Sequence, residues 1–253
     1  MVKGLDVFRA HFRSFSDRFV LIGGTACKLA MTEVGLEFRA TKDLDIVLWV
    51  EALDKSFVEA FWEFVQAGEY QTQQKSTGEK QLYRFMKPKA DAFPFMLELF
   101  AREPDVLKVA DGSQLTPLPM DEEVSSLSAI LMDTGYYEFI RDGCKETDGL
   151  PWVDAEHLIP LKASAWLDLR RRRESGERVD SKTIKKHKND VFRLYQIITP
   201  LSAPPPAQVQ RDVLAFITEA KAEGVDLKAL KVSGSLQDIM DGLARAYHCA
   251  LPG

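Results

Sequence analysis

The hydrophobic pattern starts with helical periodicity and then changes to short, unbroken apolar runs. Large apolar residues three and four positions apart predict an amphipathic helix over residues 3–16. Continuous apolar runs predict strands at 18–22 and 44–49, separated by a glycine pair and a helix that ends near Gly35. Strand and helix signals this close together indicate a domain that combines both.

The same two signals continue through the middle of the chain. Periodicity and turn residues there predict one further helix, two strands and a hairpin. The expected elements are a helix at 52–67, a polar turn or loop at 70–80, strands at 81–86 and 93–100, and a hairpin of 124–132 with 136–140 around Asp133-Thr134-Gly135.

After Gly149 the pattern becomes wholly helical. Asp154 is a good N-cap for the first of these helices. The expected helices lie at 155–173, 181–198, 209–223 and 236–247, with a proline-rich linker at 199–206. The chain is therefore predicted to have an α+β fold, with a mixed β-sheet domain at 1–150 and an all-helical C-terminal domain at 151–253.

Composition narrows the class of protein. The chain has 253 residues, of which 45% are hydrophobic and 28% charged, as in an ordinary soluble globular protein. We find neither the roughly 20-residue apolar run of a membrane helix nor a signal-peptide core. We therefore expect a cytoplasmic protein with no membrane partner. Its three cysteines lie far apart, which argues against a disulfide framework, and its four histidines show no zinc-ligand spacing.

Positive charge is concentrated in one segment of an acidic chain. The net charge is −5, yet residues 170–193 carry ten Lys or Arg and four Asp or Glu, which gives this segment +6. Such a block predicts a surface for a polyanion, although a solvated helical face is the alternative. Guanidinium groups suit phosphate, so the expected acceptor-binding residues are Arg170, Arg171, Arg172 and Arg173.

Two aspartates with one residue between them carry the strongest chemical signal. Asp43 and Asp45 begin the apolar run at 44–49, and residues two apart on a strand share a face. Two carboxylates held this close repel each other unless a cation lies between them. They therefore predict ligands for a divalent metal ion. The alternative is that one caps a helix and the other is a surface acid.

A third acid and a glycine pair extend this signal. Glu98 stands among large apolar residues, where a charge is costly unless it is solvated, paired or bound to metal. It could join the two aspartates at the metal, or it could pair with Arg84 on a neighbouring strand. Gly23 and Gly24 precede a helical segment from Thr25, and such a turn lets backbone N–H groups approach a phosphate. Paired glycines also form plain turns.

Together these motifs resemble the DNA polymerase β-like nucleotidyltransferase superfamily, and more closely the AbiEii-type toxins, including the MenT-like tRNA nucleotidyltransferases. The toxins' Arg-x-Thr-x-Asp-x-Asp pattern is matched by Arg39-Ala40-Thr41-Lys42-Asp43-Leu44-Asp45. The 19 positions from Gly24 to Asp43 exceed the spacing in the most compact members of the superfamily. The resemblance implies a nucleotidyltransferase fold, Mg²⁺ or Mn²⁺ as cofactor, an NTP as substrate, tRNA or another RNA as acceptor, and a cognate antitoxin as partner.

The resemblance extends into the helical part. Lys162-Ala163-Ser164-Ala165 is similar to a Lys-Leu-x-Ala-like motif of these toxins, and Asp190 stands at the last acid of their Lys-Asp-x-x-Asp-like motif. Lys162 could instead extend from its apolar stretch to water. Asp190 could pair with Lys186 or Arg193 on its own helix. The roles of Lys188 and Asn189 stay open, and His187 is expected to be exposed.

These observations assign the expected site residues. Asp43, Asp45 and Glu98 would bind metal and act in catalysis with Lys162 and Asp190. The expected nucleotide-binding residues are Gly23, Gly24, Thr25, Arg39, Thr41 and Lys162. Two alternatives stay open. One is a regulatory module that binds NTP or an antitoxin without turnover, and the other is nucleotidyl transfer to a small molecule or a protein.

Overall fold

The computed structural model describes residues 2–72, 82–101 and 133–250. Within these ranges, seven strands form one mixed sheet in the order β3-β4-β5-β2-β1-β7-β6. β2 runs parallel to β5 and β1 parallel to β7, whereas the other neighbours are antiparallel. The strands are β1 (Phe19–Ile22), β2 (Asp43–Leu48), β3 (Gln71–Thr72), β4 (Leu82–Met86), β5 (Met96–Ala101), β6 (Cys144–Thr147) and β7 (Leu150–Val153).

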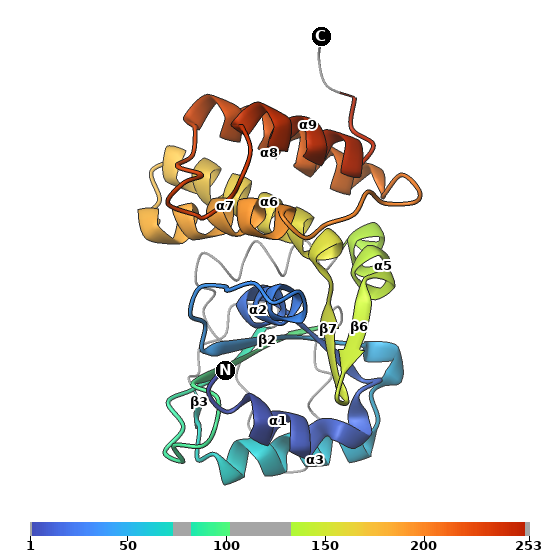
Figure 1. Cartoon of the computed structure of the whole chain (residues 1–253). Helices are drawn as coiled ribbons and strands as arrows, with labels where there is room; N and C mark the ends of the chain where they lie inside the picture. The colour runs from blue at the N-terminus through green and yellow to red at the C-terminus, as the bar shows by residue number, and fades with distance from the viewer. Residues whose placement is uncertain (1, 73–81, 102–132, 251–253) are drawn as a thin grey trace.

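Helices cover both faces of this sheet and continue into a further layer (Figure 1). α1 (Leu5–Phe12) and α3 (Lys55–Ala67) cover one face, and α2 (Gly23–Glu33) covers the other. α6 (Ala155–Glu174) and α7 (Ser181–Tyr195) pack on α2. The remaining helices are α5 (Thr134–Asp142), α8 (Ala207–Glu223) and α9 (Leu236–Ala246), with short 3₁₀ turns at Arg13–Phe15 and Val50–Ala52. The expected α+β architecture is confirmed.

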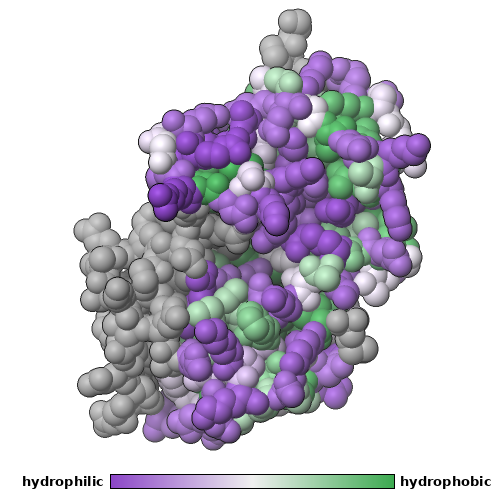
Figure 2. All heavy atoms as spheres, turned by 90° about the vertical axis from the view of Figure 1, so that its left-hand side faces the viewer, coloured by the Kyte–Doolittle hydropathy of each residue, from purple (hydrophilic) through white to green (hydrophobic). Residues whose placement is uncertain are grey.

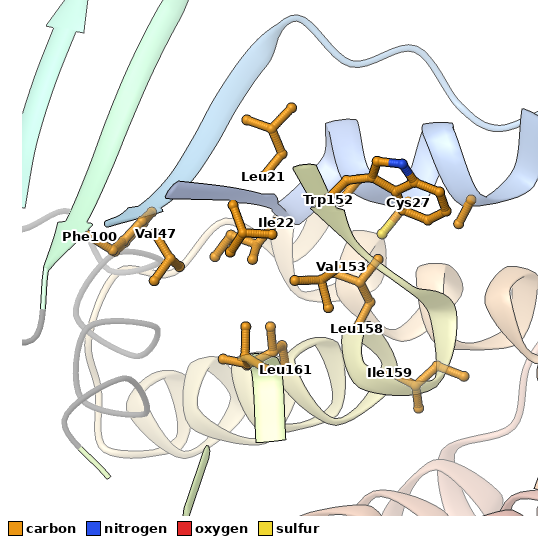
Figure 3. Packing of buried hydrophobic residues seen from close by; sticks show 14 of the residues in the cluster. Leu21, Ile22, Cys27, Val47, Phe100, Trp152, Val153, Leu158, Ile159 and Leu161 are labelled. Carbon is orange, nitrogen blue, oxygen red and sulfur yellow. The ribbon is translucent and has the colours of Figure 1, made fainter. Parts of the chain in front are cut away.

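Apolar packing joins the sheet and the helices into one hydrophobic core. Under the sheet, Phe8 of α1 contacts Phe12 with ring centroids 4.5 Å apart and meets Phe64 of α3 edge to face. The cluster of buried apolar residues continues without a break into α9. Figure 3 shows Ile22 of β1 and Leu161 of α6 turned toward one another on the side of the sheet that faces α6. The two expected domains therefore share buried surface.

The surface agrees with this internal arrangement. Hydrophilic residues predominate on the face of the molecule shown in Figure 2. Among the described residues, the large apolar side chains classed as exposed are Val34, Leu36 and Phe95. In this part of the chain, no helix combines the length and the apolar character needed to cross a membrane.

Most expected elements are found within a few residues of their expected ends, and the Asp154 cap is confirmed. The Asp154 carboxylate accepts a hydrogen bond of 3.0 Å from the backbone N–H of His157, which fixes the start of α6 one residue after β7. Pro160 lies inside α6 and cannot donate to the carbonyl of Glu156. The hydroxyl of Tyr247, at the end of α9, donates to that carbonyl instead, at 2.6 Å.

The hairpin expected around 133–135 is wrong. Residues 124–132 lie outside the described ranges, but 136–140 belong to the helix α5. The side chain of Asp133 accepts a hydrogen bond of 3.0 Å from the N–H of Tyr136, so Asp133 caps a helix rather than starting a turn.

A hairpin that the sequence analysis missed follows this helix. It consists of β6 and β7, which pair through a two-residue turn, Asp148-Gly149, with φ values of +53° and +77°. Asp-Gly is the preferred sequence for this turn type. β7 also extends the sheet to Val153, three residues past the expected domain boundary.

Candidate active site

One row of side chains crosses four strands of the sheet and brings the expected acids together. The register pairs Ile22 of β1 with Asp45 of β2, Asp45 with Glu98 of β5, and Glu98 with Arg84 of β4. Asp43 lies two residues before Asp45 and shares its face of β2. Directly opposed side chains are within contact distance in a sheet, so this register places Asp45 and Glu98 in contact.

The glycine pair makes room for these acids. Gly23 has φ +67°, and a Cβ atom there would lie 1.6 Å from Oδ2 of Asp45. A Cβ atom at Gly24 would lie 2.6 Å from the hydroxyl of Thr41. The glycines are the first residues of α2 rather than a separate turn before it. The N–H of Gly24 donates to Asp45 at 3.3 Å, where the positive end of the helix dipole favours an anion.

Thr25 connects the first turn of α2 to the start of β2. Its side chain is fully buried, and its hydroxyl donates to the backbone carbonyl of Asp43 at 2.7 Å. This bond fixes the start of β2 against the first turn of α2. The expected contact between Thr25 and a nucleotide would need this hydroxyl to turn away from β2.

Glu98 lies beside both of its expected neighbours, Arg84 and Asp45. Nε of Arg84 donates to its carboxyl oxygen at 2.6 Å, and the two side chains form an ion pair. The pKa of Glu98 is raised to about 9, because burial disfavours its charge and the neighbouring carboxylate of Asp45 repels it and shares a hydrogen bond with it. Arg84 opposes this shift without cancelling it. The raised pKa means that Glu98 binds a proton more readily than an ordinary carboxyl does.

A second buried carboxyl lies on the helical side. Asp190 of α7 is fully buried and accepts hydrogen bonds from Nε and Nη2 of Arg39 at 2.8 and 2.6 Å. Nζ of Lys162 lies 3.8 Å from Asp190, and Arg193 donates to it at 3.3 Å. Burial raises the pKa of Asp190, but the hydrogen bonds from Arg39 and the charges of Lys162 and Arg39 outweigh burial and lower it overall.

This ion-pair cluster connects the two parts of the chain. Arg39 belongs to the segment between α2 and β2, whereas Lys162 and Asp190 belong to α6 and α7. Lys162 is 5% exposed, so it meets a buried anion and does not extend to water. Asp190 pairs with Arg193 on its own helix, as one alternative anticipated, and pairs more closely with Arg39 from outside it.

A pocket of about 890 Å³ lies between the sheet and the helices. Its volume is within the range of small-molecule sites. One end is lined by charged and glycine residues, and an apolar wall comes from β4, β5 and α6. The lining residues are Gly23, Gly24, Arg39, Ala40, Thr41, Lys42, Asp43, Asp45, Arg84, Met86, Met96, Glu98, Phe100, Leu158, Leu161, Lys162, Ala165, Arg178, Asp180, Thr183, Lys186 and His187.

Some expected site residues do not line this pocket. Thr25 and Asp190 lie buried behind it. The four arginines at 170–173 also lie outside it. Arg170 stacks on Trp166 with its guanidinium carbon 4.6 Å from the ring centroid and pairs with Glu219 of α8 at 2.8 Å. These contacts direct Arg170 toward the outer helices.

Other residues line the pocket without having been expected. Arg178 and Lys186 bring positive charge from the basic segment to the pocket, and Lys42 and Arg84 add charge from the sheet side. His187 was expected to be exposed, but it is 8% exposed and faces the pocket. Thr183, Lys186, His187 and Asp190 follow an i, i+3, i+4, i+7 spacing, so helical periodicity would have placed His187 on the inner face.

Lys188 of α7 binds the C-terminal end of α8 and does not line the pocket. Its ammonium donates to the carboxylate of Glu223 at 2.8 Å and to the carbonyl of Gly224 at 2.9 Å, at the end of α8. A cation is favourable at a helix C-terminus. Lys188 therefore holds α8 against α7.

Asp43 and Asp45 are the residues best suited to a divalent cation. Both are partly exposed, both line the pocket, and both offer carboxylate oxygens, which Mg²⁺ and Mn²⁺ prefer. Over residues 2–72, 82–101 and 133–250, no group of three or more His, Cys, Asp or Glu side chains is arranged to hold a metal ion. The two aspartates thus fit a cation as a pair, whereas Glu98 is engaged by Arg84.

Comparisons with known proteins find distant structural similarity and no match in sequence. No family model and no curated protein matches the sequence. The structure is similar to an antigenic nucleotidyltransferase-like protein from Paracoccidioides brasiliensis, with 12% identity, a TM-score of 0.44, and coverage of 94% of this chain and 98% of that one. It is also similar to the Megavirus polyadenylate synthase, with 13% identity, a TM-score of 0.38, and coverage of 87% and 36%. Because both TM-scores are below 0.5, only the residues of the pocket support the function proposed below.

Proposed function

We propose that this protein is a metal-dependent nucleotidyltransferase that moves an NMP from an NTP to an acceptor hydroxyl. One observation carries the proposal. A single pocket joins the Asp43 and Asp45 pair, the glycine start of α2, and the cationic residues Arg39 and Lys162. Acids that can hold a divalent cation, beside fixed positive charge, suit the transfer of a highly charged phosphoryl group.

The aspartates would hold the cofactor in this scheme. Asp43 and Asp45 offer the ligands, and a bound Mg²⁺ or Mn²⁺ would neutralise phosphate charge during attack on the α-phosphate and departure of pyrophosphate. The chain's own contribution is to fix both carboxylates. The Gly24 N–H holds the Asp45 side chain, and the Thr25 hydroxyl holds the Asp43 backbone.

The opposite wall would receive the triphosphate. Lys162 and Arg39 lie together against Asp190, which orients both cations without filling the pocket. Preorganised charge of this kind stabilises the charge that develops in a transition state. We expect Lys162→Ala to reduce nucleotide transfer by several kcal/mol of transition-state stabilisation. The hydroxyl of Thr41 and the backbone of Gly23 and Gly24 complete this end of the pocket.

The proposed acceptor is RNA, with the 3′ end of tRNA as the specific candidate. Arg178 and Lys186 line the pocket from the basic segment 170–193 and offer contacts for a phosphate backbone. Replacing both by Glu should weaken RNA binding and reduce its salt dependence. Replacing Arg171 and Arg173, which are exposed and lie outside the pocket, provides the matched control. Equal weakening by both pairs would place the RNA on the outer helices instead.

A labelling experiment tests the function directly. The protein is incubated with each α-labelled NTP, Mg²⁺ and total cellular RNA, and Asp45→Ala serves as the inactive control. Label in RNA that depends on Asp45 supports the proposal, and the labelled species identifies the acceptor. Label in a small molecule or in protein would keep the chemistry and replace the acceptor. No labelled product with any NTP would contradict transfer to cellular RNA.

The resemblance to AbiEii-type toxins adds a proposed biological role. Transfer to tRNA would stop translation, and a cognate antitoxin would then be a required partner. Inducible expression in bacteria should arrest growth with the wild-type chain and not with Asp45→Ala. Equal growth of both strains would count against the toxin role and leave the chemistry to be judged by the labelling experiment.

One observation favours a second candidate, an NTP-binding module without turnover. Arg84 donates a hydrogen bond to Glu98 and the pKa of Glu98 is raised, so the third acid of the pattern is engaged in the absence of metal. Equilibrium NTP binding without pyrophosphate release would support the module. Pyrophosphate release that depends on Mg²⁺ would exclude it.

A further inference from the structure

Two methionines lie beside the acids on the pocket face of the sheet. Asp43 of β2 pairs in register with Met96 of β5, and Met96 pairs with Met86 of β4. The next row on this face, which holds Asp45 and Glu98, lies two residues further along the same strands, roughly 7 Å away. The proposed metal ligands therefore border a methionine pair, Met86 and Met96, on two adjacent strands.

The methionine pair offers an accessible apolar surface to a ligand. Both side chains line the pocket and are partly exposed. The other large apolar side chains of the described lining, Phe100, Leu158 and Leu161, are buried. A thioether is flexible and polarisable, and it makes favourable contacts with aromatic rings. The methionine pair therefore suits a planar aromatic group that enters the pocket from solvent.

The order of the strands indicates which aromatic group this is. The strands run β4-β5-β2-β1, so the aspartates on β2 lie between the methionine pair and the glycine start of α2, which follows β1. With the metal and the phosphates at the aspartate and glycine end, the ribose and base of an NTP extend across β5 toward β4. β4 lies two strand spacings from β2, roughly 10 Å, and a nucleoside is long enough to cover that distance. The base then lies over the methionine pair.

The spacing of the methionine pair favours a base with two rings. Neighbouring strands lie about 4.8 Å apart, so the two thioethers stand side by side at about the width of one aromatic ring. A purine can cover both side chains, whereas the single ring of a pyrimidine covers little more than one. Because apolar stabilisation grows with the area removed from water, the larger base should bind more tightly.

We propose that the methionine pair binds the base of the NTP and makes the protein prefer purine over pyrimidine nucleoside triphosphates. This inference rests on the proposed function and assigns a specificity to the same pocket. The charged end holds every NTP alike through its triphosphate. The methionine pair distinguishes the bases by the apolar area that they bury.

Equilibrium binding tests this inference without relying on transfer. ATP, GTP, CTP and UTP are each titrated into the protein by isothermal titration calorimetry, with Mg²⁺ and without RNA. Wild type should bind ATP and GTP about tenfold more tightly than CTP and UTP, which is the scale of a thioether–aromatic contact. The double variant Met86→Ala with Met96→Ala should reduce this preference to about twofold or less. Leu36→Ala, which truncates an exposed apolar side chain outside the pocket, should keep the wild-type preference.

Inorganic tripolyphosphate separates failure of this inference from failure of the proposed function, because it carries the charged groups without a base. Its affinity should be the same in wild type and in the double variant. Equal affinity of wild type for all four NTPs, or an undiminished purine preference in the double variant, would overturn the inference and leave the proposed function in place. If wild type binds neither the NTPs nor tripolyphosphate, both are wrong. If the double variant does not fold, Met86→Ala alone should reduce the preference, and an unchanged preference there would overturn the inference.

Discussion

Glu98 lines one wall of the pocket and Asp190 lies buried behind the opposite wall, and each of these carboxyls accepts a hydrogen bond from an arginine. Their pKa values nevertheless move in opposite directions. Glu98 meets one arginine and a second acid, and its pKa rises to about 9. Asp190 meets Arg39, Lys162 and Arg193, and its pKa falls. Burial alone does not decide the charge of a carboxyl, because the balance of neighbouring charges can reverse its effect.

The comparison also separates two roles. On the sheet wall, Glu98 and Asp45 are adjacent acids, and their mutual repulsion helps to raise the pKa of Glu98. On the helix wall, the negative charge is fully compensated and serves to hold two cations in place. We therefore expect the loss of Asp45 on the sheet wall to affect mainly chemistry, and the loss of Asp190 on the helix side to affect mainly stability.

The largest expected effect is on the sheet wall. Asp45→Ala should reduce nucleotide transfer by about 10³-fold, equivalent to several kcal/mol of lost charge stabilisation. The melting temperature should change little, because the side chain is only partly buried and its loss creates no cavity. Transfer is measured with labelled NTP, and the exposed Asp91→Ala serves as control. If Asp43→Ala and Asp45→Ala both keep near-wild-type transfer, the metal site is elsewhere.

The next effect is on the helix wall. Asp190→Asn removes a fully buried charge that compensates Arg39 and Lys162, so it should destabilise the fold by roughly 3 kcal/mol. Asp212→Asn is the matched control, because Asp212 is also buried but accepts from the neutral groups of Tyr136 and Gln208. Denaturant unfolding of both variants measures the difference. Equal losses would show that charge compensation is not what Asp190 provides.

The pH dependence of Asp190 has a definite sign. Its pKa in the folded state is below the ordinary value of 3.8, so its stabilising contribution is complete above that pH. The contribution is lost as the pH falls below 3.8 toward the folded-state pKa. Wild type should therefore lose stability more steeply than Asp190→Asn in this acid range.

A smaller effect concerns the glycine that admits Asp45. Gly23→Ala should cost roughly 1–2 kcal/mol of stability for its left-handed backbone, and it should also displace the Asp45 carboxylate and reduce transfer. Gly35→Ala shares the positive φ, at +75°, but a Cβ atom there meets nothing within 4 Å. It should therefore show the loss of stability with normal transfer. Normal transfer by Gly23→Ala would mean that Asp45 can shift without consequence.

The last expected effect is the pH dependence of stability that Glu98 confers. Its folded-state pKa is about 9 against an ordinary value of 4.5, so the folded state retains a proton that the unfolded state loses between these values. Stability should therefore decrease as the pH rises from about 5 to 9 in the absence of divalent cations. Glu98→Gln should flatten this decrease, and the exposed Glu63→Gln should not. Thermal melts across this pH range provide the measurement.

The sequence predicted those features that depend on neighbours along the chain. The Asp43 and Asp45 pair lies on a strand beside the Gly23-Gly24 start of α2. The sequence could predict this arrangement because period-two spacing and the backbone freedom of glycine are local properties. The helix at 136–140 was missed for a local reason as well, since Asp133 was interpreted as a turn residue rather than as a cap. Asp148-Gly149 is itself a local signal for a two-residue hairpin turn, so the sequence is sufficient to predict this hairpin.

The remaining features depend on contacts that are distant in sequence. The bond between Arg39 and Asp190 joins residues 151 positions apart, and no pattern along the chain measures that separation. The sequence also does not show which cationic residues of the basic segment reach the pocket. Arg178 and Lys186 line the pocket, whereas Arg170 faces α8. Composition located the basic segment, and only the packing of α6 on α7 and α8 decides which of its charges reach the site.

The hydrogen bond from Tyr247 to Glu156 has a consequence for synthesis of the chain. Pro160 leaves the carbonyl of Glu156 without its helical donor, and the replacement donor is made 91 residues later. At elongation rates of about 5–20 residues per second, the ribosome adds it roughly 5–20 s afterwards. The carbonyl of Glu156, in the helix that carries Lys162, therefore gains its donor only after α9 has been synthesised. A growing chain that has not yet reached Tyr247 would lack this one hydrogen bond in the helix that carries Lys162.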